Sequence, residues 1–212
     1  MNARSPIICI VRTTRQRRDG AQTRADIRKA AVELFYKHGY EATSLRAVAD
    51  RVGIQVGSLY NHIGGKDELL VDIMSTVLER LFPVVDEAAD AAGADPVERF
   101  KAAVGAHIRF HAQHAQETFI GNSELRSLRP EQRKVIIKAR REYERMIQRF
   151  ISEAADAAGM EILDLRLQSY AILALGMHVA SWFRDDRQGL SLDRVVEVYT
   201  DVSCRQIGIP TG

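Results

Sequence analysis

Residues 23–70 read TRADIRKAAVELFYKHGYEATSLRAVADRVGIQVGSLYNHIGGKDELL, and this stretch decides the fold of the first third of the chain. Its first part predicts a helix over about residues 23–38, which Gly39 ends. The apolar residues of that helix recur at intervals of three and four positions, so they share one face. They are Ile27, Ala30, Ala31, Leu34 and Phe35.

A second and a third helix follow after short breaks. Thr43 offers a hydroxyl N-cap for the second helix, in which apolar residues again recur at helical spacing. Gly53 interrupts the chain for a few residues before a very short third helix begins near Gln55. A helix interrupted so briefly turns sharply and packs the next one across it, which predicts a helix-turn-helix whose short third helix suits a DNA major groove.

The charges of the chain are divided unevenly along its length. Residues 1–66 hold 12 Lys and Arg against 5 Asp and Glu, whereas the remainder holds 18 against 23. The first third therefore attracts a polyanion and the rest does not. Residues 1–21 have no helical periodicity, and we expect a flexible basic arm there, either a solvated tail or a segment that reaches phosphates or the minor groove.

Turn residues divide the whole chain into about nine helical segments, without the alternation typical of strands, so the expected fold is all-α. We expect an arm at 1–21, a helix-turn-helix domain at 22–68, and an effector-binding and dimerisation domain at 69–212. The later helices are expected over about residues 66–92 with a kink at Pro83, 96–114, 117–128, 130–158, 163–184 and 192–207.

Composition argues for a reducing compartment. The two cysteines, Cys9 and Cys204, lie at opposite ends and provide neither a disulfide framework nor a metal spacing. Residues 5–11 are too short for a secretory apolar segment, and the apolar run at 169–183 is too short to cross a bilayer. We therefore expect a cytoplasmic protein with no membrane partner.

The helix-turn-helix domain at 22–68, called the head below, resembles the same domain of a known family. AVELFYKHGYEATSLRAVA, GSLYNHI and GKDELL, in this order and spacing, resemble the DNA-binding head of TetR family bacterial transcription regulators. The resemblance implies a homodimer on double-stranded operator DNA. It implies phosphate contacts from Tyr60, His62 and Lys66, and the helix start at Thr43 and Ser44 is a further phosphate site.

Base reading is expected from the recognition segment, because Gln and Asn bond adenine edges and Val touches a thymine methyl. Its members are Gln55, Val56, Gly57, Ser58 and Asn61, with Arg46 as an added contact to a phosphate or guanine. Gln55, Val56 and Ile63 depart from the residues common in the family at these positions. The first two are expected to tune the operator sequence, and Ile63 is expected to be a packing change.

The body, residues 97–207, resembles a branch of that family that responds to acyl-CoA or related CoA thioesters. HIRFHAQHAQETFIGNSELRSLRPEQRKVIIKARREYERMI and GMHVASWFRDDRQGLSLDRVVEVY carry the resemblance. It implies an effector enclosed by the middle helices and a dimer through the last two. The effector-binding candidates are Arg109, Phe110, Asn122, Arg126, Tyr143, Met177, His178 and Trp182, each of which has core or surface pairing as its simpler role.

Three histidines, His107, His111 and His114, share one face of their helix. Pocket lining, plain structural roles and a metal site are all open for them, although no acid or Cys completes a metal set in the sequence. We expect no metal and no cofactor. The chain also lacks a Gly-rich phosphate loop, a nucleophile elbow and paired carboxylates, so we expect no enzyme activity.

These observations predict a ligand-responsive repressor that binds a near-palindromic operator as a dimer and is released by an effector, an acyl-CoA or related CoA thioester. One alternative is a regulator of efflux or other metabolism that responds to a hydrophobic ligand without CoA. A second is a small-molecule binding or scaffold protein whose head has lost operator specificity, since Gln55 and Val56 replace more usual contacts.

Overall fold

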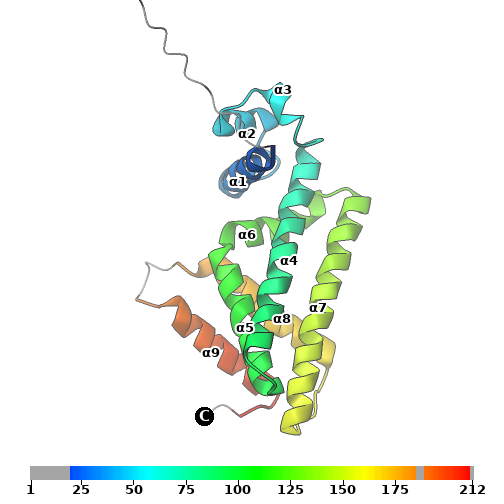
Figure 1. Ribbon diagram of the computed structural model, residues 1–212, viewed down its shortest axis with the longest axis vertical. Coiled ribbons are helices and arrows are strands. Elements are labelled where there is room, and N and C mark those ends of the chain that lie inside the picture. Colours follow the sequence, from blue (N-terminus) through cyan, green and yellow to red (C-terminus); the bar gives the residue numbers. More distant parts are fainter. Residues whose placement is uncertain (1–19, 185–188, 211–212) are drawn as a thin grey trace, which may run out of the picture.

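The computed structural model describes residues 20–184 and 189–210, and over these residues the chain is all-α, as expected (Figure 1). The described residues form nine α-helices and one 3-10 helix. Their bounds are α1 Gly20–His38, α2 Leu45–Val52, α3 Val56–Leu59, α4 Lys66–Ala91, α5 Pro96–Gln113, α6 Ala115–Ser123, η1 Leu125–Ser127, α7 Pro130–Ala158, α8 Leu165–Trp182 and α9 Leu192–Gln206.

Several boundaries differ from the expected ones. Residues 20 and 21, which we assigned to the arm, belong to α1, while residues 1–19 lie outside the described residues. The expected helix at 117–128 is present with other bounds: α6 runs from Ala115 to Ser123, and the Ser127 N–H bonds three residues back to the Glu124 carbonyl at 2.9 Å, in the tighter 3-10 pattern. The Asp164 carboxylate accepts from the Leu167 N–H at 2.9 Å and so starts α8 two residues later than expected.

The head consists of α1, α2 and α3 around one small core. Ile27, Val48 and Leu59, one from each helix, are fully buried in it. Gly53 ends α2 in the left-handed region at φ 76°, and its N–H bonds to the Asp50 carbonyl at 3.2 Å. Because this conformation is strained for residues with a Cβ, glycine lets the chain turn here and lay α3 across α2.

Helix α4 joins the head to the body without a break. Its buried residues near the start, Leu69 and Ile73 among them, belong to the head core, and those further along, such as Leu81 and Val85, belong to the body core. The helix continues through Pro83 as one element, although proline removes one backbone donor. The boundary that we expect at residues 68 and 69 therefore falls within a single helix.

Body and head also meet away from α4. Ile120, Leu128 and Ile136, from the α6–α7 region, pack in the head core. Two ion pairs also tie the start of α4 to its neighbours: Asp72 with Arg24 of α1 at 2.8 Å, and Asp67 with Arg129, just before α7, at 2.7 Å. The orientation of the head is thus set by the body elements that it contacts.

Helix α5 lies at the centre of the body, where it contacts α4, α7, α8 and α9. Its buried residues Phe100, Val104 and Ile108 fill the middle of the body core. In Figure 1 the head lies at one end of the molecule, and α4 and α7 run lengthwise through the rest.

A close contact between α5 and α8 yields a prediction about stability. A Cβ at Gly176 in α8 would collide with the ring of His107 in α5, which is fully buried and cannot move aside freely. We expect Gly176→Ala to lower the free energy of unfolding by about 1–3 kcal/mol, because overpacking outweighs the gain in helix propensity. Urea titration followed by circular dichroism measures it.

The matched control is Gly121→Ala in α6. A Cβ there makes only an ordinary contact with the Arg140 guanidinium at 3.6 Å, so the substitution should be neutral or stabilise by up to about 1 kcal/mol. A Gly176→Ala protein as stable as the wild type, at equal protein concentration, would contradict the close contact.

Candidate functional site

The recognition segment consists of α3 and the turn that follows it. Gln55, Ser58 and Asn61 are exposed, and the Tyr60 side chain is 54% exposed. The backbone N–H groups of Asn61 and His62 bond three residues back, so these residues and Tyr60 belong to the turn after α3 and not to the helix itself. The segment thus presents several polar side chains to solvent.

Two buried side chains hold this segment in place. Leu59 is fully buried and Ile63 is 3% exposed, both in the head core. The packing role expected for Ile63 agrees with this burial. Val56 and His62 are half-buried and Gly57 is exposed, so all the expected base-reading residues reach the surface at least in part.

The start of α2 differs from the expectation. Ser44, not Thr43, caps the helix, and its hydroxyl accepts from the Ala47 N–H at 3.1 Å. Thr43 is buried, and its hydroxyl donates to the carbonyl of Gly39 at 2.8 Å. The Thr43 side chain therefore faces the protein interior and is not a phosphate contact, whereas Ser44 and the exposed Arg46 stay on the surface.

Lys66 opens α4 beside the recognition segment. Its ammonium lies 4.3 Å from the centre of the Tyr40 ring and donates to the Glu41 carbonyl at 3.1 Å. An ammonium has three donors, so this bond leaves others for a phosphate. The contacts hold the charge close to the head surface, where a phosphate contact requires it.

The body contains a partly open cavity of about 250 Å³ among α4, α5, α6, α7 and α8. Three of the expected effector-binding residues line it: Asn122, Tyr143 and Met177. The other residues of its wall were not singled out from the sequence, apart from two histidines. They are Met74, Val77, Leu78, Leu81, His107, His111, Glu117, Thr118, Gly121, Arg140, Glu144, Tyr170, Leu173 and Ala174.

His107 forms a hydrogen-bonded unit inside this cavity. Its Nδ1 lies 2.8 Å from the Tyr143 hydroxyl, and its Nε2 lies 3.2 Å from the Leu173 carbonyl. Burial lowers the pKa of His107 to about 4 and raises the pKa of Tyr143 well above its usual value. Both groups are therefore neutral at pH 7.

His111 lies one helical turn further along α5. Its Nδ1 is 2.9 Å from the Thr118 hydroxyl, and its ring meets the His107 ring edge to face, with centroids 4.5 Å apart. Burial, and then the neighbouring His107, lower the pKa of His111 well below its usual value. The third histidine, His114, lies apart at the end of α5, where its Nε2 is 3.1 Å from the Arg80 guanidinium.

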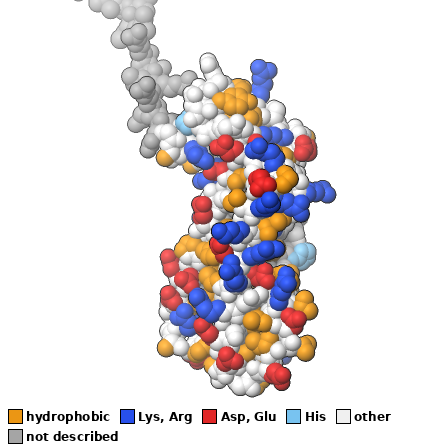
Figure 2. All heavy atoms as spheres, turned by 90° about the vertical axis from the view of Figure 1, so that its right-hand side faces the viewer, with side chains coloured by type: hydrophobic (Ala, Val, Ile, Leu, Met, Phe, Trp, Pro, Cys, Tyr) orange, Lys and Arg blue, Asp and Glu red, His pale blue; other side chains and the backbone are white. Residues whose placement is uncertain are grey.

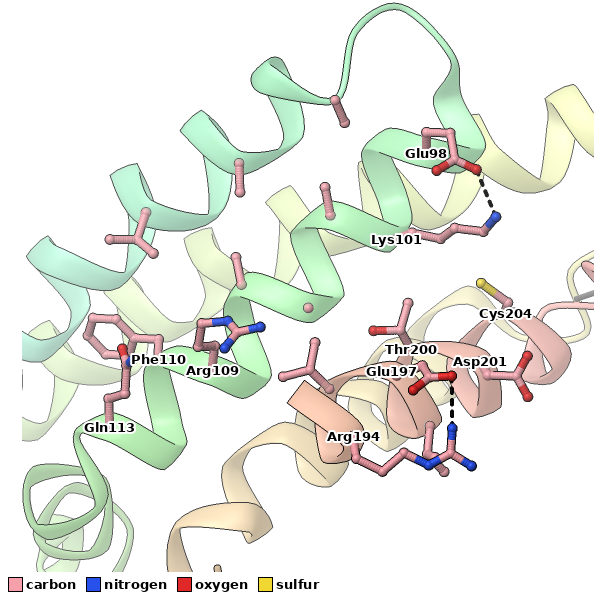
Figure 3. A pocket seen from close by; sticks show the side chains of 18 of the residues that line it. Glu98, Lys101, Arg109, Phe110, Gln113, Arg194, Glu197, Thr200, Asp201 and Cys204 are labelled. Carbon is pink, nitrogen blue, oxygen red and sulfur yellow. Dashed lines mark hydrogen bonds and ion pairs between the residues drawn. The ribbon is translucent and has the colours of Figure 1, made fainter. Parts of the chain in front are cut away.

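An open groove of about 1180 Å³ lies elsewhere, among α4, α5 and α9, and it contains two other expected effector residues, Arg109 and Phe110 (Figure 3). Figure 3 shows charged side chains along the groove, but they are paired: Arg109 with Asp193 at 2.8 Å, and Arg194 with Glu197 at 2.8 Å. These residues do not share the cavity of Tyr143, because α5 presents them on a different face from the histidines.

The three remaining effector candidates lie outside the cavity as well. His178 lines a shallow depression that adjoins the cavity at Asn122 and Met177. Trp182 is 39% exposed and packs against Tyr199, with ring centroids 6.3 Å apart. Arg126 is exposed on η1. Sequence spacing alone does not separate these positions from the cavity wall.

The face of the body on which α7 lies carries charges of both signs. Figure 2 shows the face on which α7 lies, and there basic and acidic side chains are interleaved. On α7, for instance, Lys134 pairs with Glu131 at 2.9 Å, and Arg149 lies 3.6 Å from Asp86. We therefore locate the candidate DNA contacts on the head.

The described part of the chain contains neither a candidate metal site nor a candidate membrane-spanning helix. Within residues 20–184 and 189–210, no group of three or more His, Cys, Asp or Glu is placed to hold a metal ion. No helix in these same ranges has the length and apolar character needed to cross a membrane.

Two family models match the chain. The model of bacterial regulatory proteins of the tetR family matches residues 27–73, which contain most of α1 and all of α2 and α3. The model of the tetracyclin repressor-like C-terminal domain matches residues 93–207, which is more than half of the chain. The two matches divide the chain as the head and body do.

Known proteins resemble the chain in sequence and in fold. The transcriptional repressor KstR2 of Mycobacterium tuberculosis is 29% identical over 122 residues, which are 58% of this chain and 60% of that protein. The chain thus matches about three fifths of that relative's length. A tetR-family regulatory protein from Rhodococcus has a TM-score of 0.80 at 28% identity, over 90% of this chain and 99% of its own.

AibR, solved in complex with isovaleryl coenzyme A and operator DNA, has a TM-score of 0.75 at 24% identity, over 85% of this chain and 97% of its own. At this identity the likeness shows a common fold. The two matching models, together with a helix-turn-helix head joined to an all-α body, establish that the chain belongs to the TetR family of bacterial regulatory proteins.

Proposed function

We propose that this protein is a dimeric, ligand-responsive transcriptional repressor that binds a near-palindromic operator and leaves it when a small-molecule effector occupies the body. The observation that most supports this proposal is that Gln55, Ser58, Tyr60 and Asn61 are exposed on a helix-turn-helix. Residues of these types bond base edges and phosphates in a major groove. Leu59, buried in the head core, holds this segment in place. The relative KstR2 is named a transcriptional repressor, which supports this role. We propose that the present protein acts in the cytoplasm.

The proposed dimer joins two copies through α8 and α9. Leu163, just before α8, is 93% exposed, and Leu167 and Tyr170 on α8 are 63% and 41% exposed. On α9, Val202 is 43% exposed. An apolar surface of this kind favours a partner subunit. A dimer would present two heads to half-sites about one helical turn apart, roughly 34 Å.

We propose that the effector is an acyl-CoA or related CoA thioester whose acyl or ring portion enters the cavity. The volume of about 250 Å³ exceeds the roughly 150 Å³ of a cavity that holds benzene, so it accepts a small ring or a short branched acyl group. The CoA portion would lie outside, beyond the exposed wall residue Asn122 of α6, which is not part of the proposed dimer surface. The isovaleryl coenzyme A bound to AibR motivates this choice.

The proposed release depends on α6, which contacts both the cavity and the head. Thr118 and Asn122 line the cavity, while Phe119 between them packs against Tyr36 of α1, with ring centroids 5.4 Å apart. Arg184, after α8, donates to the same Tyr36 hydroxyl at 3.2 Å. A ligand that prefers another position of α6 would shift α1 with it, in proportion to that preference.

One alternative has a specific observation in its favour. The cavity can enclose a whole small apolar molecule, and most of its wall is apolar. A hydrophobic ligand without CoA, in the control of efflux or of other metabolism, would then be the effector. The ligand prediction below separates the two.

The proposed base contact of Asn61 can be tested by substitution. Asn61→Ala should weaken operator binding about 5- to 150-fold, because a good base contact contributes about 1–3 kcal/mol to discrimination, and it should leave binding to a scrambled duplex unchanged. Fluorescence anisotropy, with duplexes from the region upstream of the protein's own gene at one fixed salt concentration, measures both affinities.

Gln116→Ala removes another exposed amide, from α6, and serves as the control that should bind as the wild type does. If Asn61→Ala leaves operator affinity intact, or reduces affinity for both duplexes alike, Asn61 does not read a base. If the wild-type protein binds both duplexes equally well, the head has lost its specificity.

A further prediction concerns the effector. Isovaleryl-CoA at 100 times its Kd should raise the free energy of unfolding by about 2.7 kcal/mol, and it should release the operator duplex. Met177→Trp should abolish both effects by filling the cavity, whereas Val135→Trp, at a position 59% exposed on α7, should keep them. Thermal shift and anisotropy give the two readouts.

CoA alone and free isovalerate are the comparison ligands and should stabilise the protein far less. A panel in which isovalerate or toluene stabilises as strongly as the thioester would favour the alternative, a ligand without CoA.

A further inference from the structure

The polar groups that face the cavity nearly all have partners. The His107 Nε2 faces the Leu173 carbonyl, which only accepts, so Nε2 carries the proton and Nδ1 accepts from the Tyr143 hydroxyl. The Arg140 guanidinium donates to the Gly121 carbonyl at 2.6 Å, and the Tyr170 hydroxyl accepts from Arg166 at 3.0 Å. The Glu144 carboxylate accepts from Gln148 at 3.0 Å.

His111 is different. Its side chain is 6% exposed, its Nδ1 is engaged by Thr118, and its Nε2 is buried with no hydrogen-bond partner among the described residues. An imidazole nitrogen left unpaired in an apolar surrounding is costly, since it has lost its water without gaining a protein partner. The same nitrogen is therefore available to a molecule that enters the cavity.

We propose that the His111 Nε2 hydrogen-bonds the effector inside the cavity, and that the buried end of the effector is an apolar group that carries one uncharged oxygen, a carbonyl or a hydroxyl. This inference rests on the proposed role of the cavity as the effector site. It adds the chemical class of the buried group and assigns one residue that recognises it.

An uncharged oxygen fits this site better than a carboxylate or an ammonium group. The wall includes apolar side chains such as Met74, Leu81 and Leu173, which cannot solvate a charge. Its two carboxylates already have neighbours, since Glu117 lies 3.9 Å from His114 and Glu144 accepts from Gln148. The cation of the cavity wall, Arg140, donates to the Gly121 carbonyl, which holds its guanidinium toward α6. Burial also keeps His111 neutral by lowering its pKa, so its ring offers a neutral donor or acceptor.

The orientation of Thr118 decides which of these two it offers. If the Thr118 hydroxyl donates to Nδ1, then Nε2 carries the proton and donates to a carbonyl. If Nδ1 donates to Thr118, then Nε2 accepts from a hydroxyl. Both arrangements recognise one uncharged oxygen, and a matched ketone and alcohol tell them apart.

The test uses the full-length protein with ¹⁵N-labelled histidine and three probes of nearly equal size: cyclohexane, cyclohexanone and cyclohexanol. Nuclear magnetic resonance follows the His111 nitrogens during each titration. We expect the ketone or the alcohol to bind about tenfold more tightly than cyclohexane, and to shift the His111 Nε2 signal, because a net hydrogen bond contributes about this factor.

Two substitutions on α5 separate a specific hydrogen bond from general packing. His111→Phe keeps a ring of similar shape but removes both nitrogens, so the oxygen-bearing probe should lose its tenfold advantage. His114→Phe makes the same change outside the cavity and should retain it. Should His111→Phe fail to fold, the titrations of the wild-type protein still decide.

The possible outcomes distinguish a failure of the proposed His111 hydrogen bond from a failure of the proposed repressor function. Equal affinity of the wild type for the three probes, or no shift of the His111 Nε2 by any of them, overturns the hydrogen bond. Isovaleryl-CoA that stabilises His111→Phe as it stabilises the wild type also overturns it, while the proposed repressor stands. A probe preference that depends on His111, in a protein that ignores operator DNA, supports the hydrogen bond and defeats the repressor.

Discussion

Helix α4 has to satisfy two hydrophobic cores at once, and the rest of the structure depends on that constraint. Leu70 is fully buried in the head core, and Val85, four turns further along, is fully buried in the body core. Each such side chain contributes about 1.5–3 kcal/mol through burial. Because a helix is stiff over this length, a displacement of the body half of α4 also displaces the head.

Helix α6 adds a second constraint of the same kind, at shorter range. Thr118 and Phe119 are adjacent in sequence, yet one contacts His111 at the cavity and the other packs on Tyr36 of the head. The helix has only nine residues, so it offers little length over which a displacement could be absorbed. The cavity and the head are therefore connected through ordinary packing, without a hinge segment between them.

The fold and the head could be predicted from the sequence, because the signals are local. The spacing of apolar residues and the positions of glycines and prolines predict the helices. The recognition segment is one contiguous stretch of the sequence. The errors also have local causes. Thr43 and Ser44 are both plausible caps from sequence, and only the packing of α1 against α2 buries the Thr43 hydroxyl.

The cavity could be predicted only in part, because its wall is assembled from five helices. On α5, Arg109 and Phe110 lie between His107 and His111 in sequence, but they face the open groove while the histidines face the cavity. The rotation of each helix about its own axis sorts such neighbours, and it depends on packing against residues far away in the chain.

The sequence by itself determined that this is an all-α chain with a basic helix-turn-helix head, since helical periodicity and charge are properties of contiguous residues. Only the tertiary structure decided which side chains enclose a cavity and which polar atom in it lacks a partner. Among residues 20–184 and 189–210 the His111 Nε2 has no hydrogen-bond partner because of what five helices place around it, and no local pattern of residues records that arrangement.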